Sequence, residues 1–392
     1  MKFYFILFYF LDFTLLHSIN LEDIIKSATQ PKLFEKIIQE EQLALESKKL
    51  ANRETAPLTY NQSLSRSEGG VYGFEHEISF SKEFKLGNIL ALEQQQNQLN
   101  NEAYLLEEER KIYRYEYYLK TLYHEYCLKA FYFDNFEKEV KQFRVLYRKK
   151  EHAFKEDEIS RKELLQLDLE KERLEESLKR VEMEQANAKK QLLDLTILQS
   201  KEALFCQDLS PILMKVTLKD NAFNLTEKAY DKRIESTQVG LKRYTQKLES
   251  IEVEMGYTKE LDRDMYTIGV SIPLNFSTRK SEYEKASLLH YSSVLSLKNQ
   301  QIIEERNSKI KVFQKRLEEA FISIEAQAKM IQRYQDTLLP LMKKSYQYGE
   351  SSVIEYLLSQ QKLYHWQQVL LEKKQGYYKT LFQFYSMSEI RG

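Results

Sequence analysis

Two short parts of the chain alternate between apolar and polar side chains, and both are expected to form β-hairpins. Every other residue over 266–276 is apolar, and residues 72–80 alternate in a similar way. A period of two residues predicts a strand with one apolar and one polar face. A shorter alternating stretch lies upstream of each strand, beyond a turn-rich segment. We therefore expect hairpins over 57–84 and 249–276.

The rest of the chain has the periodicity of helices. From Leu164 to Leu195, positions spaced alternately by three and four residues are mostly apolar, which is the seam of a coiled coil. The expected helices cover residues near 21–52, 85–156, 158–198, 221–248, 277–348 and 350–388. The longest would extend about 110 Å at 1.5 Å per residue. The predicted fold is mainly α, with long antiparallel coiled-coil helices and a small β part of four strands.

The sequence also contains an internal repeat. When it is shifted by 192 positions, 157–165 falls on 349–357 and the two alternating strands fall on each other, without gaps. The identical pairs in the first region are Glu158/Glu350, Ser160/Ser352, Glu163/Glu355 and Leu165/Leu357. One offset that serves two distant regions indicates tandem copies of one unit. We assign the copies to 19–205 and 206–392.

The amphipathic hairpins suit two environments. They could pack on helices in a soluble protein, or they could belong to an outer-membrane β-barrel. In the second case, Glu75 and Glu77 would face the lumen. The residues expected to face lipid are Phe74, Ile78, Tyr266, Ile268, Val270 and Ile272. Because four strands cannot close a barrel and an open edge does not persist in lipid, several chains would have to share one barrel.

Composition narrows the class of protein. The chain has only 10 Gly and 5 Pro among 392 residues, too few turn residues for a compact α/β enzyme of this length. Its 59 basic residues balance 59 acidic ones, which disfavours binding to nucleic acid. Nucleotide-binding Gly loops, nucleophile elbows and zinc-ligand spacings do not occur in the sequence. We therefore expect no enzyme activity, no cofactor and no metal site.

The first 18 residues resemble a secretory signal peptide, because Lys2 is followed by a short apolar stretch. A buried N-terminal helix is the alternative. The sequence has two cysteines, Cys127 and Cys206, and we expect an exported protein without a disulfide framework. His124 and Cys127 could share one helix face and touch a metal ion. Two ligands are a weak signal, and the neighbouring aromatic residues favour a packing layer instead.

The segment 346–363, YQYGESSVIEYLLSQQKL, resembles the helix-turn-helix at the periplasmic tip of the outer-membrane efflux protein family, whose best-known member is TolC. It contains a Gly turn followed by Ser, an acidic residue and a leucine run. The stretch 270–274, VSIPL, resembles the strand that leads into the second long helix of that family. The resemblance covers essentially the whole mature chain.

The resemblance implies a homotrimer in the outer membrane of a Gram-negative bacterium, with a large periplasmic portion. Its strands would form one shared twelve-stranded transmembrane β-barrel, and its helices would form an α-barrel. Such a channel is the passive exit duct of a tripartite efflux or export system. Its partners are a periplasmic adaptor (membrane fusion) protein and an inner-membrane pump of the RND or ABC type. Drugs, metal cations and polypeptides all leave through this family, and the short chain gives only a weak preference for metal cations.

The resemblance also implies roles for individual residues at the gate and at the adaptor contact. Tyr346 and Glu355 match the tyrosine and the first aspartate of the periplasmic gate, whereas Leu358 stands at the second aspartate and Ser351 replaces a gate arginine. We therefore expect a ring of Glu355, joined by Glu163 of the first copy, and such rings favour cations. The alternative is that Glu355 is an exposed first-turn residue that suits the helix dipole. The expected adaptor-contact tips are Asp157, Glu158, Gly349 and Glu350.

Two other functions fit part of the pattern. A coiled-coil scaffold protein of the cytosol or periplasm would account for the helices but not for the duplicated amphipathic hairpins. A periplasmic adaptor also contains a coiled-coil hairpin, but it needs a large Gly-rich β-domain, which this sequence does not show.

Overall fold

The structure is a computed structural model. It describes residues 19–53, 57–69, 71–198, 204–216, 224–246, 248, 250–260, 262–272 and 279–390. The expected signal peptide, 1–18, lies outside the described residues. The chain divides into two compact units: unit 1 comprises Met1–Lys32, Tyr113–Ala222 and Lys309–Gly392, and unit 2 comprises Leu33–Ile112 and Phe223–Ser308.

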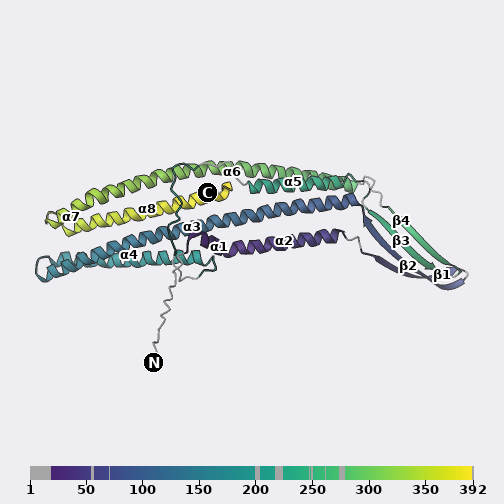
Figure 1. Ribbon diagram of the computed structural model, residues 1–392, viewed down its shortest axis with the longest axis horizontal. Coiled ribbons are helices and arrows are strands. Elements are labelled where there is room, and N and C mark those ends of the chain that lie inside the picture. The colour runs from purple at the N-terminus through teal and green to yellow at the C-terminus, as the bar shows by residue number, and fades with distance from the viewer. Residues whose placement is uncertain are drawn as a thin grey trace, which may run out of the picture. The chain divides into compact units, whose positions relative to one another are not determined.

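Long helices dominate the described residues, and the predicted fold class is confirmed (Figure 1). In chain order the elements are α1 (Leu21–Ser27), α2 (Thr29–Arg53), β1 (Thr59–Gly69), β2 (Val71–Lys85), α3 (Gly87–Lys155), α4 (Arg161–Leu193), α5 (Leu225–Arg243), β3 (Ser250–Lys259), β4 (Asp264–Ser271), α6 (Arg279–Arg333), the π-helix η1 (Tyr334–Leu338), α7 (Leu339–Gln347) and α8 (Val353–Ser388). At 69 residues, α3 is far longer than the usual helix of about 11–12 residues.

Unit 2 contains a four-stranded antiparallel sheet whose strands follow the chain order β1-β2-β3-β4. The register places Tyr60 opposite Phe80, Phe80 opposite Met255, and Met255 opposite Ile268. Because side chains alternate between the two faces of a strand, these four apolar residues lie on one face of the sheet. Within the described residues, β1 and β4 each have one neighbouring strand and therefore form the two edges of the sheet.

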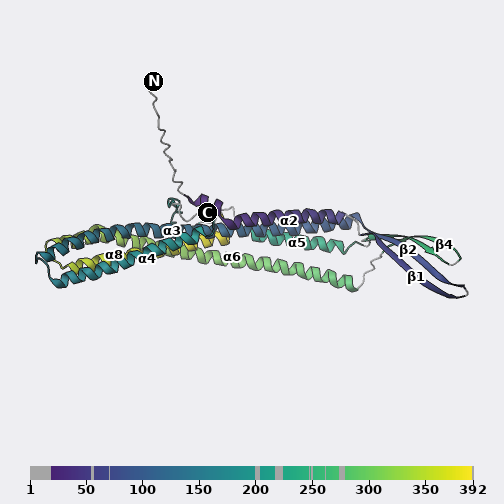
Figure 2. The same ribbon diagram turned by 90° about the horizontal axis from the view of Figure 1, so that it is seen from below.

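The helices of unit 1 pack around a core that the coiled-coil periodicity predicted. Figures 1 and 2 both show α4 beside the C-terminal part of α3, and Figure 1 shows α8 beside α7. On α4, the seam positions Leu167, Leu174 and Val181 are buried, seven residues apart. They share one apolar cluster with buried residues of α3 and α8, such as Phe136 and Leu357. This cluster joins the two helical hairpins of unit 1, of which the first is formed by α3 and α4 and the second by α7 and α8.

One expectation about the cysteines is wrong. Cys127 on α3 forms a disulfide with Cys206, and their Cα atoms are 5.3 Å apart. The two residues are separated by 79 positions in the sequence, and α4 brings the chain back beside α3 between them. Because this return depends on tertiary packing, residue spacing alone did not show the pairing. The disulfide also removes Cys127 as a metal ligand.

The long helical stretch that precedes α8 is interrupted. A π-helical turn, Tyr334–Leu338, separates α6 from α7, and Pro340 lies in the first turn of α7. Proline has no backbone N–H, so it is tolerated at the start of a helix but not in its interior. The break therefore falls where the sequence places this proline.

Candidate functional site: two tip turns and an apolar sheet face

The two helical hairpins of unit 1 end in turns with the same backbone geometry. One residue in each turn has a left-handed backbone, Asp157 with φ 58° and Gly349 with φ 75°. The next amide donates to the carbonyl five residues earlier, at 2.8 Å from Glu158 and at 2.9 Å from Glu350. This is the hydrogen-bond pattern of a Schellman turn. Asp tolerates the left-handed conformation better than most residues, so the first turn forms without Gly.

The helices that follow the two turns begin with the same cap. The hydroxyls of Ser160 and Ser352 accept hydrogen bonds from the amides of Glu163 and Glu355, at 3.2 and 3.3 Å. The carboxylate of Glu355 also accepts from the amide of Ser352 at 3.2 Å, which completes a capping box. Glu355, predicted as a gate residue, therefore stabilises the start of α8. The structure assigns no capping box to Glu163.

A lysine that the sequence analysis missed connects two of the predicted gate residues. Lys150 Nζ lies 3.3 Å from Glu163 Oε1 and 4.9 Å from the centre of the Tyr346 ring. Burial lowers the pKa of Lys150, but Tyr346 and Glu163 outweigh this effect, and the pKa lies above its ordinary value. The Tyr346 ring stacks on Tyr356 with centres 5.4 Å apart. The structure thus brings Tyr346 and Glu163 together, whereas Glu355 is held at its own helix start.

A second polar contact links the two hairpins farther from the turns. Glu170 on α4 is 6% exposed, and it accepts hydrogen bonds from Arg173 Nε at 2.8 Å and Nη2 at 2.6 Å. Gln361 on α8 donates to the same carboxylate at 2.6 Å. A buried carboxylate is tolerated only when it is paired, and here it has partners from two helices. The contact therefore fixes the position of α8 along α4.

Glu139 on α3 is a buried carboxylate that accepts a longer hydrogen bond than those made to Glu170. Gln367 on α8 donates to its Oε1 at 3.4 Å. Burial raises the pKa of Glu139 to about 7, and the hydrogen bond from Gln367 lowers it only in part. This group therefore binds a proton near neutral pH, unlike an ordinary glutamate.

The residues predicted to face lipid lie on one face of the sheet. Tyr266, Ile268 and Val270 pair with Tyr257, Met255 and Val253, and Ile78 also pairs with Tyr257. Phe74 lies four residues before Ile78 on the same face of β2, and Ile272 directly follows β4. These side chains are strongly exposed at several positions, with 79% for Tyr266 and 78% for Ile268. A large apolar face left open to solvent marks a site of contact with protein or membrane.

The opposite face of the sheet is polar. It carries Glu75 and Glu77 on β2 together with Glu252 and Glu254 on β3, because all four occupy the alternate positions of the register. The hydroxyl of Ser63 on β1 donates to Glu77 at 3.1 Å. The predicted division of the hairpins into an apolar and a polar side is thus present on β2, β3 and β4, whereas β1 also places Gln62 and Arg66 on the apolar side.

Two further features concern membranes and metals. None of the helices in the described part of the chain combines the length and the hydropathy that a membrane crossing requires. The described residues also contain no group of three or more His, Cys, Asp or Glu placed to hold a metal ion.

Comparison with known proteins gives a clear result for the fold alone. No family model matches the sequence, and no curated protein matches it. Among solved structures, the transmembrane channel CusC has a TM-score of 0.73 at 14% identity, covering 94% of this chain and 91% of that chain. The CmeC outer-membrane channel of Campylobacter jejuni has a TM-score of 0.72 at 12% identity, covering 94% and 85%. The outer-membrane protein VceC of Vibrio cholerae has a TM-score of 0.71 at 12% identity, covering 94% and 96%. The chain therefore has the fold of the TolC-like outer-membrane channels, as its resemblance to that family implied.

Proposed function

We propose that this chain is the outer-membrane channel subunit of a tripartite efflux or export system. It acts as a passive exit duct and not as an enzyme. The observation that carries the proposal is the sheet, which is apolar on one exposed face and polar on the other. A soluble protein gains nothing from such a face unless another element covers it, whereas a membrane barrel requires it.

The open edges of the sheet support a trimer. Unpaired backbone groups at β1 and β4 cannot be satisfied by lipid, so other chains must complete the barrel. Three copies would supply twelve strands, the arrangement implied by the family resemblance. In this homotrimer the apolar face contacts the lipid of a Gram-negative outer membrane, and the helices extend into the periplasm. Glu75, Glu77, Glu252 and Glu254 then line the lumen.

The tips of the two helical hairpins are the proposed entrance. Three copies of Glu355 would form an acidic ring there, and the cap that engages one carboxylate oxygen holds each copy in a fixed position. Lys150 would restrain the entrance, because it joins Glu163 of the first hairpin to Tyr346 of the second. Movement of the second hairpin away from the first would break the contact between Lys150 and Tyr346.

The same tips are the proposed site for a periplasmic adaptor. Asp157, Glu158, Gly349 and Glu350 form the two turns, and a groove of about 680 Å³ beside them is lined by residues of α3, α7 and α8. Lys149, Lys150 and Lys343 make this groove basic, and Val145 and Leu146 make part of it apolar. An adaptor helix with acidic and apolar side chains would suit both properties. The adaptor would in turn connect the duct to an inner-membrane pump of the RND or ABC type, which selects the drug or metal cation.

Cell fractionation tests this function directly. The protein is expected in the outer membrane as a trimer that migrates as one band until the sample is boiled. Deletion of the gene, followed by growth on a panel of drugs and metal salts, then identifies the cargo. A monomer in the soluble periplasmic fraction would exclude the channel and favour the scaffold or adaptor alternative.

A further inference from the structure

Residues 204–216 of unit 1 form an irregular segment that follows the α3–α4 hairpin. Apart from a β-bridge between Ile19 and Leu204, the segment belongs to no helix or strand. Backbone groups outside regular structure must bond to side chains or water. The position of this segment therefore depends on the groups that hold it from outside.

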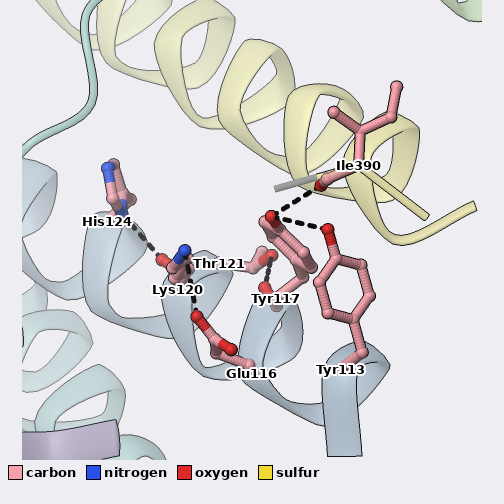
Figure 3. A network of polar contacts seen from close by, with 7 residues as sticks. All are labelled: Tyr113, Glu116, Tyr117, Lys120, Thr121, His124 and Ile390. Atoms are coloured by element: carbon pink, nitrogen blue, oxygen red, sulfur yellow. Dashed lines mark hydrogen bonds and ion pairs between the residues drawn. The ribbon is translucent and has the colours of Figure 1, made fainter. Parts of the chain in front are cut away.

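One set of anchors comes from α3. His124 is fully buried, and its Nε2 accepts a hydrogen bond from the amide of Ser210 at 2.8 Å. Its Nδ1 lies 2.7 Å from the carbonyl oxygen of Lys120. A dashed line marks this hydrogen bond in Figure 3. Because Nε2 accepts, Nδ1 carries the proton and the ring is neutral. Burial lowers the pKa of His124 to about 4, which keeps the ring neutral at physiological pH. The hydroxyl of Tyr123 donates to the carbonyl oxygen of Phe205. His124 is thus a structural anchor with both ring nitrogens engaged.

A second set comes from α8. The hydroxyl of Tyr378 donates to the carbonyl oxygen of Ser210 at 2.7 Å. The hydroxyl of Tyr377 accepts from the amide of Leu213 at 2.7 Å. The segment is therefore held between α3 and α8, by hydrogen bonds that are individually weak in net terms.

The covalent anchor is the disulfide between Cys127 and Cys206. Cys127 is buried on α3, one turn beyond His124, whereas Cys206 is partly exposed near the start of the segment. The two cysteines flank the distal part of α3, the tip turn and all of α4. The cross-link therefore closes the base of the hairpin whose other end carries the proposed entrance.

We propose that Cys127 and Cys206 are a modification site for a thiol–disulfide oxidant of the compartment to which the protein is exported, and that their cross-link locks residues 204–216 onto α3 and α8. The locking role does not depend on the channel function proposed above. Reducing conditions in the cytosol would keep both thiols free, so the lock forms only after export. The exposure of the two cysteines decides which one reacts first, because the oxidant can reach Cys206 but not the buried Cys127.

The chemistry is a two-step thiol–disulfide exchange. The Cys206 thiolate attacks a sulfur of the oxidant disulfide, forms a mixed disulfide and releases one oxidant thiolate. The Cys127 thiolate then attacks Cys206 Sγ, forms the Cys127–Cys206 bond and releases the second oxidant thiolate. Two electrons pass from the cysteines to the oxidant, which leaves as a dithiol after taking up the two protons that the cysteines lose.

The first test measures the state of the cysteines. Protein isolated from whole cells is alkylated before and after reduction, and its peptides are identified by mass spectrometry. We expect no alkylation before reduction and a linked peptide pair that contains Cys127 and Cys206. Two free thiols in the isolated protein would overturn the assignment.

The second test measures how strongly the disulfide holds residues 204–216 in place. Trypsin binds the residues on both sides of the cleaved bond in an extended form, so cleavage after Lys215 requires Leu213 to leave Tyr377 and Val216 to leave Gln314. We expect this cleavage to be at least about tenfold faster in a C127S/C206S variant than in the wild type. Tyr378→Phe is the matched control, because it loses one hydrogen bond but keeps the cross-link. Its cleavage rate should still rise when a water-soluble phosphine is added, whereas the rate of the double variant should not.

If the double variant does not accumulate, the wild type is compared before and after treatment with phosphine. The same increase in cleavage is expected, and an unchanged rate in linked and reduced protein would show that the cross-link locks nothing. Because cleavage is measured on the chain itself, the result stands whether or not the protein conducts any substrate. A missing trimer with an intact lock would count against the channel proposal alone.

Discussion

A lysine placed on either face of β4 tests whether the sheet lies in a membrane. Ile268 and Thr267 are neighbours in the middle of this strand, so their side chains point to opposite faces. Ile268 is 78% exposed and lies opposite Met255 on the apolar face. Thr267 lies opposite Gly256, and its hydroxyl occupies the space that a side chain at position 256 would fill. The two substitutions add the same charge at neighbouring positions of the same strand, on opposite faces.

The free energy by which Ile268→Lys should destabilise the barrel follows from the position of the residue. A lysine on the lipid face of a barrel costs about 2–4 kcal/mol at the bilayer midplane and less near the interfaces. Three copies in one trimer would therefore lose on the order of 6–12 kcal/mol, which is comparable to the whole stability of a typical domain. Thr267→Lys would face water in the lumen, close to several glutamates, and should cost about 1 kcal/mol or less.

Unboiled and boiled membrane samples on a gel measure the outcome. Ile268→Lys should remove the trimer band, and Thr267→Lys should leave it near the wild-type amount. Equal loss in both variants would indicate a general effect on folding, and equal tolerance would contradict a lipid-facing apolar surface. Ile268→Val keeps the apolar character and serves as the control for a change of shape.

Three other predictions concern the helices. Lys150→Met should weaken the restraint between Tyr346 and Glu163 by about 1 kcal/mol per copy. If these residues stand at the proposed entrance, this variant should raise the open fraction of the purified protein in planar bilayers, whereas Lys149→Met should not. Burial raises the pKa of Glu139 to about 7 from 4.5, so the folded state keeps a proton that the unfolded state loses, and this group lowers stability as pH rises through this range. Buried neutral His124 acts in the opposite direction below pH 6.5, so the measurement is the difference in thermal unfolding temperature between Glu139→Gln and the wild type, which should increase in favour of the variant as pH rises to 7. Amide hydrogen exchange should be faster in α7 than over 147–155 of α3, because α7 follows a π-helical turn, and equal rates would show that this break has no effect on local stability.

The sequence was sufficient for the features that depend on local periodicity. The alternation around Ile268 predicted the faces of the sheet, and the heptad spacing on α4 predicted Leu167 and Leu174 as buried positions. Both patterns arise because side-chain direction follows directly from the repeat of the strand or the helix. The resemblance of the 346–363 segment supplied the fold itself, which the structural neighbours share at low identity.

The missed features depend on how separate helices come together. Lys150 is one of many lysines on α3, and only the approach of α7 places its ammonium over the Tyr346 ring. The pairing of Cys127 with Cys206 likewise requires the return of the chain along α4. The role of Glu355 in a capping box was available from the sequence, since Ser352 precedes it by three residues, but the resemblance drew attention to a gate instead.

The two tip hairpins share their turns but not the helices that lead into them. Asp157 and Gly349 have the same handedness, and both are followed by a serine cap, so the local geometry at the 192-residue offset is nearly identical. The first hairpin is approached by one unbroken helix of 69 residues and is closed at its base by the disulfide. The second is approached through a π-helical turn and a short α7 that buries none of its residues. Local opening is least costly where few contacts and few helical hydrogen bonds must be broken. If the entrance moves, the second hairpin is therefore the part that moves. Its movement breaks the contact between Tyr346 and Lys150 of the first hairpin.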